Sequence, residues 1–288
     1  MPTSAIADSL AVLYRIKPGS TVDLTAIDPD GLEDQGDRKA SQAQMEKNIE
    51  RLRDLQYLLY AEGQRGVLIC LQAMDTGGKD GLIRHVFGVM NPQGCRVHAF
   101  KAPTAEEAAH DFLWRVHKVI PAQGETVIFN RSHYEDVLVP RVHNSVPKAV
   151  WLARYDAINQ FEKHLADNRI HIMKIFLHIS KEEQLRRFSK RLENPAKHWK
   201  ISEADYSERK YWDAYQDAYQ DLLQRCSTSW APWYVIPANN KHARDQVVLQ
   251  LAVDFLESLD MSVPLPTVDL EFIRTKYHAE VRKQGKAT

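Results

Sequence analysis

The sequence predicts an α/β fold in which one parallel five-stranded sheet lies between layers of helices. Five short apolar segments alternate with longer segments in which apolar residues recur every three or four positions. The first apolar segment, Val67–Leu71, leads through a glycine-containing loop into a helical pattern. Another, Thr126–Phe129, is apolar throughout, as a strand covered on both faces requires. Ligands of such sheets bind beyond the carboxyl ends of the strands.

Local signals place each element. We expect a helix from Ser41, where Gln44 completes a capping box, to Gly63. The next helix begins at Thr104 with Glu107 as its box partner, and a third begins at Ser180 with Glu183. The other expected strands are 96–100, 170–179 and 233–236, and the other expected helices are 82–90, 104–118, 147–165, 208–226, 245–259 and 268–283.

The chain of 288 residues is long enough for one large core. We expect an irregular N-terminal arm at 1–40, which is rich in Gly, Pro and Asp from residue 14 onward, and a helical tail at 261–288. Between them, 41–260 should form one domain. Within it, about 181–210 follows the fourth strand and should form a helical lid.

Composition excludes several function classes. The 38 basic and 38 acidic residues give no net charge, so no global field attracts nucleic acid or a membrane. The three cysteines have no ligand-like spacing, which indicates neither a zinc site nor a disulfide framework. No basic, apolar leader begins the chain, and no apolar run approaches the roughly 18 residues of a membrane span. We therefore expect a cytoplasmic protein without nucleic-acid or membrane partners.

The loop after the first strand has the composition of a phosphate-binding loop. Its glycines allow a sharp turn that aims backbone N–H groups inward, and Lys79 can reach a terminal phosphate. The usual pattern is G-x-x-x-x-G-K-[ST], but here Ala73 replaces the first glycine and Asp80 replaces the hydroxyl. The alternative is an ordinary turn with a solvated lysine. The loop glycines are Gly77, Gly78 and Gly81.

Asp75 is an acid inside this loop, where a carboxylate beside phosphates is costly unless a metal bridges them. We therefore expect Asp75 to bind Mg²⁺, directly or through water, or to orient the acceptor. The alternative is a side chain that caps its own turn. Asp80 is equally compatible with a site role and with a solvent-facing acid in the first helical turn.

The third strand ends in a second polar segment, which should converge with the glycine loop. Asn130 stands where a Walker-B acid would hold the metal, and Arg131 can clamp phosphate through two hydrogen bonds. Glu135 is positioned to contact the acceptor or its metal. We expect His133 and Tyr134 to be packing or hydrogen-bonding residues.

A basic stretch follows the fourth strand. Residues 181–200 contain seven lysines and arginines but three acids. Arg187 and Arg191 are four apart and share one face of a helix. The stretch could be a solvated face, but its position favours a lid that closes over phosphates.

Five segments together resemble the second family of polyphosphate kinases, and the resemblance extends from about Tyr14 into the tail. It implies a P-loop kinase-like (thymidylate-kinase-like) fold with a helical lid, and transfer of the terminal phosphate of polyphosphate to a nucleotide with Mg²⁺. The family also forms homo-oligomers. The segments are AMDTGGKDG at 73–81, NPQG at 91–94, FNRSHYED at 129–136, KHWK at 197–200 and WDAY at 212–215.

The resemblance implies residue roles. The version of the third-strand segment with Glu135 resembles the subgroup that accepts AMP and ADP, whereas many members carry Asp at the Asn130 position, so Asn130 leaves the metal anchor open. The implied catalytic residues are Asp75, Lys79, Arg131, Arg187 and Arg191, with Asp75 as metal ligand. The implied substrate-binding residues are Gly77, Gly78, Asp80, Gly81, Arg84, Asn130, Glu135 and Lys197.

The leading hypothesis is a reversible, Mg²⁺-dependent transfer of phosphate from polyphosphate to AMP or ADP, with GMP and GDP as further acceptors. A conventional nucleoside monophosphate kinase that uses ATP needs the same loop and lid. A non-catalytic protein that binds polyanions such as RNA is the third reading, although no recognised RNA module is present.

Overall fold

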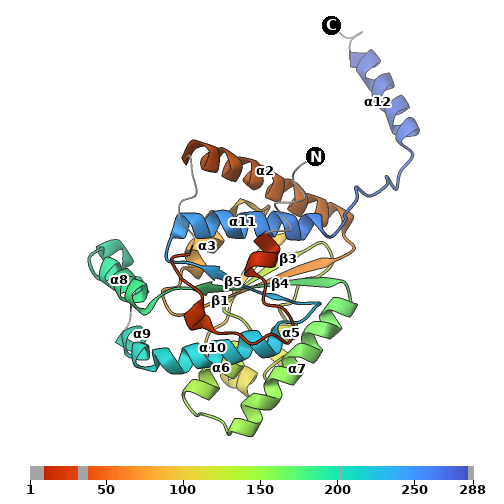
Figure 1. Cartoon of the computed structure of the whole chain (residues 1–288). Coiled ribbons are helices and arrows are strands. Elements are labelled where there is room, and N and C mark those ends of the chain that lie inside the picture. The colour runs from red at the N-terminus through yellow and green to blue at the C-terminus, as the bar shows by residue number, and fades with distance from the viewer. Residues whose placement is uncertain (1–9, 32–37, 202, 285–288) are drawn as a thin grey trace.

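A five-stranded parallel sheet in the order β2-β3-β1-β4-β5 forms the centre of the computed structural model, which describes residues 10–31, 38–201 and 203–284 (Figure 1). The expected fold class, a P-loop kinase-like parallel sheet between helices, is confirmed. The strands are β1 (Gly66–Ala73), β2 (Cys95–Ala99), β3 (Thr126–Asn130), β4 (Ile170–His178) and β5 (Trp233–Pro237).

The central strand determines where the site can form. All eight residues of β1 are buried, and it pairs with β3 on one side and β4 on the other. In this register Leu71 lies opposite Asn130 and Ile175. The parallel register therefore brings the loop after β1 and the polar end of β3 to the same edge of the sheet, as the sequence predicted.

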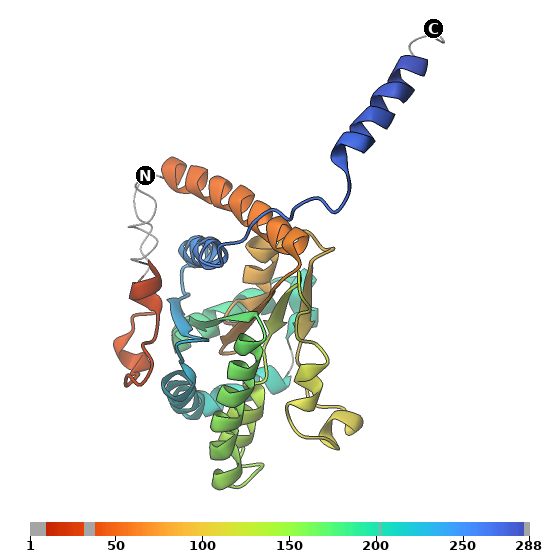
Figure 2. The ribbon, with the colours of Figure 1, turned by 90° about the vertical axis from the view of Figure 1, so that its right-hand side faces the viewer.

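Helices cover both faces of the sheet. Helices α2 and α11 lie on one face, and α6, α7 and α10 lie on the other (Figures 1 and 2). The helices are α2 (Arg38–Glu62), α3 (Lys79–His85), α4 (Ala105–Ala108), α5 (Trp114–His117), α6 (Glu135–Val142), α7 (Lys148–Asp167), α8 (Lys181–Leu192), α9 (Glu203–Ser207), α10 (Trp212–Cys226), α11 (Lys241–Glu257) and α12 (Leu270–Gln284).

The expected start of the first long helix is wrong. Helix α2 already includes Arg38, so Ser41 lies inside it and does not cap it. The Ser41 hydroxyl instead accepts a hydrogen bond from the side chain of Gln246 on α11. The expected end is confirmed, because Gly63 follows the last helical residue with a φ of 61°.

Three further differences from the predicted helices are present. The helix expected at 104–118 is two short helices, α4 and α5, although the capping box of Thr104 and Glu107 is present. Helix α6 was not expected, since Pro140 lies inside it. Ser180 caps α8, but the Glu183 carboxylate binds arginines of that helix instead of completing a capping box.

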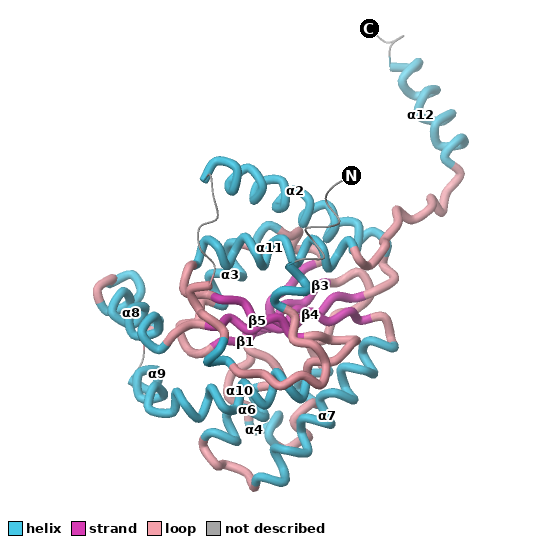
Figure 3. The backbone as a smooth tube through the Cα atoms, viewed as in Figure 1, coloured by secondary structure: helices cyan, strands magenta, loops and turns pink. Residues whose placement is uncertain are grey.

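The lid comprises α8, a 3₁₀ turn at Pro195–Lys200, α9 and a 3₁₀ turn at Glu208–Tyr211. In Figure 3 the helices α8 and α9 stand beside the edge of the sheet where the strands end. These elements cover the range of about 181–210, and the role of this range as a lid stays a prediction.

The first and last described segments lie at the periphery (Figure 1). Near the N-terminus Arg15 forms an isolated bridge with Tyr234 of β5. Helix α12 projects away from the rest of the molecule (Figures 1 and 2). The parts of the predicted arm and tail at 1–9, 32–37 and 285–288 lie outside the described residues. Among the described helices, none combines the length and apolarity needed to cross a membrane.

Candidate active site

The loop between β1 and α3 has a backbone that only glycine permits at two positions. A Cβ at Gly77 would collide with the Ala73 side chain and lie 2.8 Å from the Met74 carbonyl oxygen. Gly78 has a φ of 105°, which disfavours any side chain. Thr76 adopts a φ of 62° without being glycine. The loop therefore stores backbone strain, a feature that clusters at ligand-binding sites.

Lys79 directs a largely unpaired ammonium into this loop. Its Nζ donates to the Ala73 carbonyl oxygen at 3.1 Å, which is its one hydrogen bond to the described residues. An ammonium has three N–H donors, so two are available for a ligand. Burial, together with the neighbouring Arg131 charge, lowers the pKa of Lys79 to about 8. Lys79 therefore favours a state in which an anion stabilises its charge.

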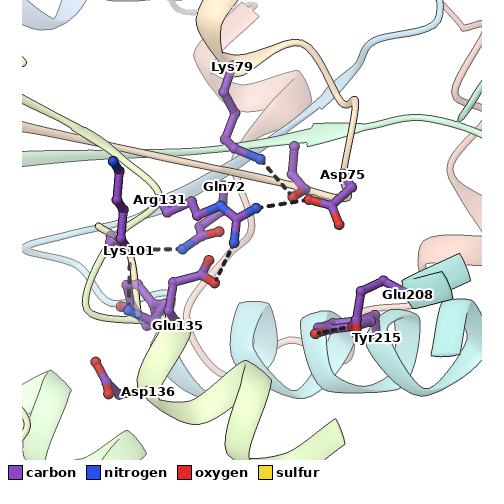
Figure 4. Close-up of polar contacts among 12 residues, drawn as sticks. Gln72, Asp75, Lys79, Lys101, Arg131, Glu135, Asp136, Glu208 and Tyr215 are labelled. Atoms are coloured by element: carbon purple, nitrogen blue, oxygen red, sulfur yellow. Dashed lines mark hydrogen bonds and ion pairs between the residues drawn. The ribbon is translucent and has the colours of Figure 1, made fainter. Parts of the chain in front are cut away.

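Arg131 joins the two strand ends. Its Nη2 donates to Asp75 Oδ1 at 3.0 Å, and its Nη1 lies 3.5 Å from Glu135 Oε2, as Figure 4 shows. The Arg131 backbone has a φ of 61°, and its N–H donates to the Leu71 carbonyl oxygen at 3.1 Å. A strained backbone thus fixes a guanidinium that faces both acids.

Asn130 and Asp80 form a second link between these strand ends. The Asn130 side-chain amide donates to Asp80 Oδ1 at 2.9 Å, and Lys200 Nζ from the lid lies 3.0 Å from Asp80 Oδ2. Burial would raise the pKa of Asp80, but these two hydrogen bonds lower it. Asp80 is therefore a contact point between the loop and the lid. It is not an acid that faces only solvent.

The two lid arginines have different surroundings. Arg187 is 5% exposed, and its N–H groups donate to Glu183 and to the carbonyl oxygens of Thr76, Ala238 and Asn239. Four of its five donors are thus occupied within the protein. To the part of the chain that the structure describes, Arg191 donates once, to the Lys200 carbonyl oxygen at 2.9 Å. Arg187 therefore braces the glycine loop, whereas Arg191 keeps most of its donors.

These groups line one cavity of about 800 Å³. Of the thirteen predicted site residues, twelve line it, including Arg84 and the exposed Lys197. Glu135 does not line it and instead lies behind Arg131. Among the described residues, eleven lysines and arginines but only two acids, both aspartates, line the cavity. A chain without net charge has therefore concentrated positive charge at one place.

Sequence reasoning missed three of these cations, Lys101, Lys241 and Arg244. Lys101 follows β2, and the other two lie in the first turns of α11, directly after β5. The rule that ligands bind beyond the carboxyl ends of parallel strands points to all three positions. Neither segment carries a glycine loop, and so neither drew attention on its own.

The oxygen ligands of the site suit a magnesium ion that is bound together with a phosphate. Among the described residues no group of three or more His, Cys, Asp or Glu could enclose a metal. Mg²⁺ does not require such a group, because it usually binds one or two carboxylates, substrate phosphates and water. Asp75 offers a partly exposed carboxylate at the mouth of the loop. The residues present therefore fit this ion.

Comparisons with known proteins agree with this geometry. A relative from Meiothermus ruber named AMP/ADP-polyphosphate phosphotransferase is 50% identical over 261 residues, which cover 90% of this chain and 98% of that protein. A relative from Rhodopseudomonas palustris named ADP-polyphosphate phosphotransferase is 44% identical over 270 residues, 88% of this chain and 92% of that protein.

A solved structure from Arthrobacter aurescens TC1, titled polyphosphate kinase 2, superposes with a TM-score of 0.89 at 42% identity. The match covers 94% of this chain and 96% of that one. The sequence model of the family described as Polyphosphate kinase 2 (PPK2) matches residues 35–263. The chain therefore belongs to the polyphosphate kinase 2 family.

Proposed function

We propose that the protein transfers the terminal phosphate of inorganic polyphosphate to AMP or ADP. The observation that carries this proposal is the cavity beside the glycine loop, with eleven basic residues against two acids among the residues described. A long polyphosphate chain carries about one negative charge on each of many phosphates, so it can contact more of these cations than ATP, which has only three phosphates. The names of the Meiothermus ruber and Rhodopseudomonas palustris relatives support both the donor and the acceptors.

Positioning and charge neutralisation account for catalysis at this site. Lys79 and Arg131 hold the transferred phosphate between the two strand ends, and the lid cations hold the rest of the polymer. An oxygen of the acceptor's terminal phosphate then attacks the terminal phosphorus of the polyphosphate in line. The bridging P–O bond to the rest of the chain breaks, and the polyphosphate, shortened by one phosphate, leaves with the bond's electron pair. This phosphate has a second pKa of about 6, so it is already ionised near pH 7 and needs no strong general base. Asp75 and Glu135 orient Arg131 through its two Nη groups.

Mg²⁺ is the proposed metal, and Asp75 would hold it together with phosphate oxygens and water. When bound, the ion would offset the negative charge of the phosphates. Asn130 is neutral and already donates to Asp80, which favours Asp75 as the protein ligand.

The test is an assay of the purified protein with AMP or ADP, long-chain polyphosphate and Mg²⁺, followed by chromatography of the nucleotides. We expect ADP and ATP to form and EDTA to stop the reaction. GMP and GDP are assayed in the same way as further acceptors. Product formation with ATP but not with polyphosphate would instead establish a conventional nucleoside monophosphate kinase. Salt-sensitive binding of RNA without any nucleotide product would support a polyanion-binding protein.

We also propose the division into an arm at 1–40, a catalytic domain at 41–260 and a tail at 261–288.

Helix α12 exposes five large apolar side chains, which an assembly of identical chains would cover. They are Leu270, Phe272, Ile273, Tyr277 and Val281. Size-exclusion chromatography with light scattering tests this association, and a monomeric full-length chain would contradict it. The cytoplasm is the proposed location, because it supplies the nucleotides.

A further inference from the structure

Arg244 is a buried cation at the phosphate loop. Its side chain is 1% exposed and lies in the first turn of α11, yet it lines the cavity. Its Nε and Nη2 both donate to Asp245 Oδ1, at 2.9 and 2.5 Å. Asp245 Oδ2 in turn lies 3.1 Å from His85 Nδ1 on α3. The guanidinium is thus held from behind, and its direction is fixed before any ligand arrives.

The third nitrogen of this guanidinium makes no hydrogen bond to the described residues. This nitrogen, Arg244 Nη1, is buried. An unpaired donor on a buried cation is costly, so structures usually pair such groups. The unpaired nitrogen is also the one that faces the loop, because a Cβ at Gly78 would collide with it. The missing acceptor therefore belongs on the loop side, inside the cavity.

A second guanidinium meets the same glycine. A Cβ at Gly78 would lie 3.3 Å from Arg187 Nη1, which keeps one N–H that no group of the described residues uses. An unused N–H group of Arg187 on α8 and one of Arg244 on α11 thus both lie close to the backbone of Gly78. Two guanidinium groups this close repel each other unless an anion lies between or beside them.

Other cations enlarge this cluster. Lys190 and Lys241 line the same cavity. Burial and the charges of Arg187, Lys190 and Arg244 lower the pKa of Lys241, against the opposing effect of Glu183. The four cations Arg187, Lys190, Lys241 and Arg244 thus have two close acids, Glu183 and Asp245. An excess of positive charge remains, which a bound anion would neutralise.

We propose that Arg244 binds a phosphate of the polyphosphate donor through Nη1, over Gly78, and that Asp245 is a positioning residue that aims it. This inference rests on the proposed function and deepens it by adding a donor contact from outside the glycine loop and the lid. The phosphate chain then passes between α8 and α11. The nucleotide lies elsewhere, toward Arg131 and Glu135, so Arg244 affects donor binding selectively.

The main test is Arg244→Met, which keeps much of the side-chain volume and removes the donors. Loss of a charge-assisted hydrogen bond should raise the KM for polyphosphate about ten- to a hundredfold, with the KM for ADP within twofold of the original value. Arg244→Lys keeps the charge but loses the planar guanidinium with its paired N–H donors, and should give an intermediate KM for polyphosphate. Tripolyphosphate should raise the melting temperature of the unsubstituted protein more than that of Arg244→Met.

Arg141→Met is the matched control. Arg141 is a partly buried arginine that, like Arg244, is paired with an aspartate, here Asp221 at 2.6 Å, but it does not line the cavity. Its loss should lower stability and leave both KM values unchanged. If Arg244→Met behaves like Arg141→Met, with an unchanged KM for polyphosphate and an unchanged effect of tripolyphosphate, Arg244 is only structural and the inference is wrong.

Two further outcomes are distinguishable. If Arg244→Met does not fold, Asp245→Asn replaces it: a selective rise in the KM for polyphosphate supports the inference, and an equal rise for both substrates overturns it. If the unsubstituted protein transfers no phosphate from polyphosphate, the proposed function fails. The tripolyphosphate-dependent melting temperatures then still decide whether Arg244 binds a phosphate.

Discussion

Two lysines, one on strand β4 and one at the start of helix α3, have opposite surroundings. Lys174 lies on β4 with no exposed surface, and its Nζ donates to Tyr134 Oη at 2.8 Å, to Glu162 at 2.6 Å and to the Cys226 carbonyl oxygen at 2.6 Å. All three of its donors are therefore occupied. Lys79, the first residue of α3 after the glycine loop, donates only to the Ala73 carbonyl oxygen among the described residues.

The Lys174 cluster includes two residues from the same motif as Arg131. His133 and Tyr134 are fully buried, and both lie within hydrogen-bond distance of Glu162, at 3.0 and 2.8 Å. The prediction that these two are packing or hydrogen-bonding residues is confirmed. One short segment thus supplies a structural cluster on one side and a site residue on the other.

The comparison teaches that the number of unused donors separates structural cations from ligand-binding ones. Lys174 needs no ligand, because the protein satisfies its charge completely. Lys79, Arg191 and Arg244 keep donors that face a cavity. Burial alone does not separate these groups, since Lys174 and Arg244 are both almost fully buried.

The largest expected effect comes from replacing Lys79 or Asp75 at the glycine loop. Lys79→Ala or Asp75→Ala should lower kcat/KM for polyphosphate by about 10³-fold or more. The first removes a cation aimed at the reacting phosphate, and the second removes the proposed metal ligand and a partner of Arg131. The Lys79 variant should melt no lower than the unsubstituted protein, since its depressed pKa shows that the fold disfavours its charge. Substantial turnover in either folded variant would contradict the assigned roles.

Replacing Lys174, whose three donors are occupied, should lower stability and leave catalysis unchanged. Lys174→Met leaves Glu162 as an uncompensated buried carboxylate, which should cost about 3–5 kcal/mol of unfolding free energy. Urea unfolding measures this loss, and the fraction that stays folded should keep its kcat. The double variant Lys174→Met/Glu162→Gln should regain part of the stability. A Lys174→Met protein as stable as the original would show that this cluster is dispensable.

The pH dependence sharpens the comparison further. Because the pKa of Lys79 is about 8, kcat/KM for polyphosphate should fall as pH rises through 8 and the free enzyme loses this charge. Bound phosphate favours the charged form, so kcat should fall only at higher pH. Rate profiles between pH 6.5 and 10 measure both. Lys79→Arg, whose guanidinium stays protonated, should lose the fall near pH 8, and a fall that persists would assign it to another group.

The smallest effect is expected at the exposed edge of the site. Lys200→Met breaks the ion pair with Asp80, which is largely exposed and so contributes below about 1 kcal/mol to stability. The KM for polyphosphate should rise a few-fold, because one lid contact with the loop is lost. Lys163→Met is the control, since Lys163 pairs with Asp167 on an exposed helix face away from the cavity. Equal kinetics in both variants would exclude a role for the Lys200 contact.

Much of the fold and part of the site follow from local sequence. The apolar strands, the glycine loop and the helix ends marked by Gly63 and Thr104 depend on residues a few positions apart. The parallel sheet then places the ends of β1 and β3 together, so the meeting of Asp75 with Arg131 was predictable. Helix α6 was not, because Pro140 contradicts a helix unless packing favours it.

Only the tertiary structure decided which charged groups remain unsatisfied. Residues far apart in sequence determine this: Ala238 occupies a donor of Arg187, whereas the unused nitrogen of Arg244 lies over Gly78. A sequence names the donors and acceptors, but hydrogen bonds form according to distance in the folded chain. The residue types of this protein predicted a phosphate site, and the packing of α8 and α11 against the loop determined which of its described cations keep unused donors there.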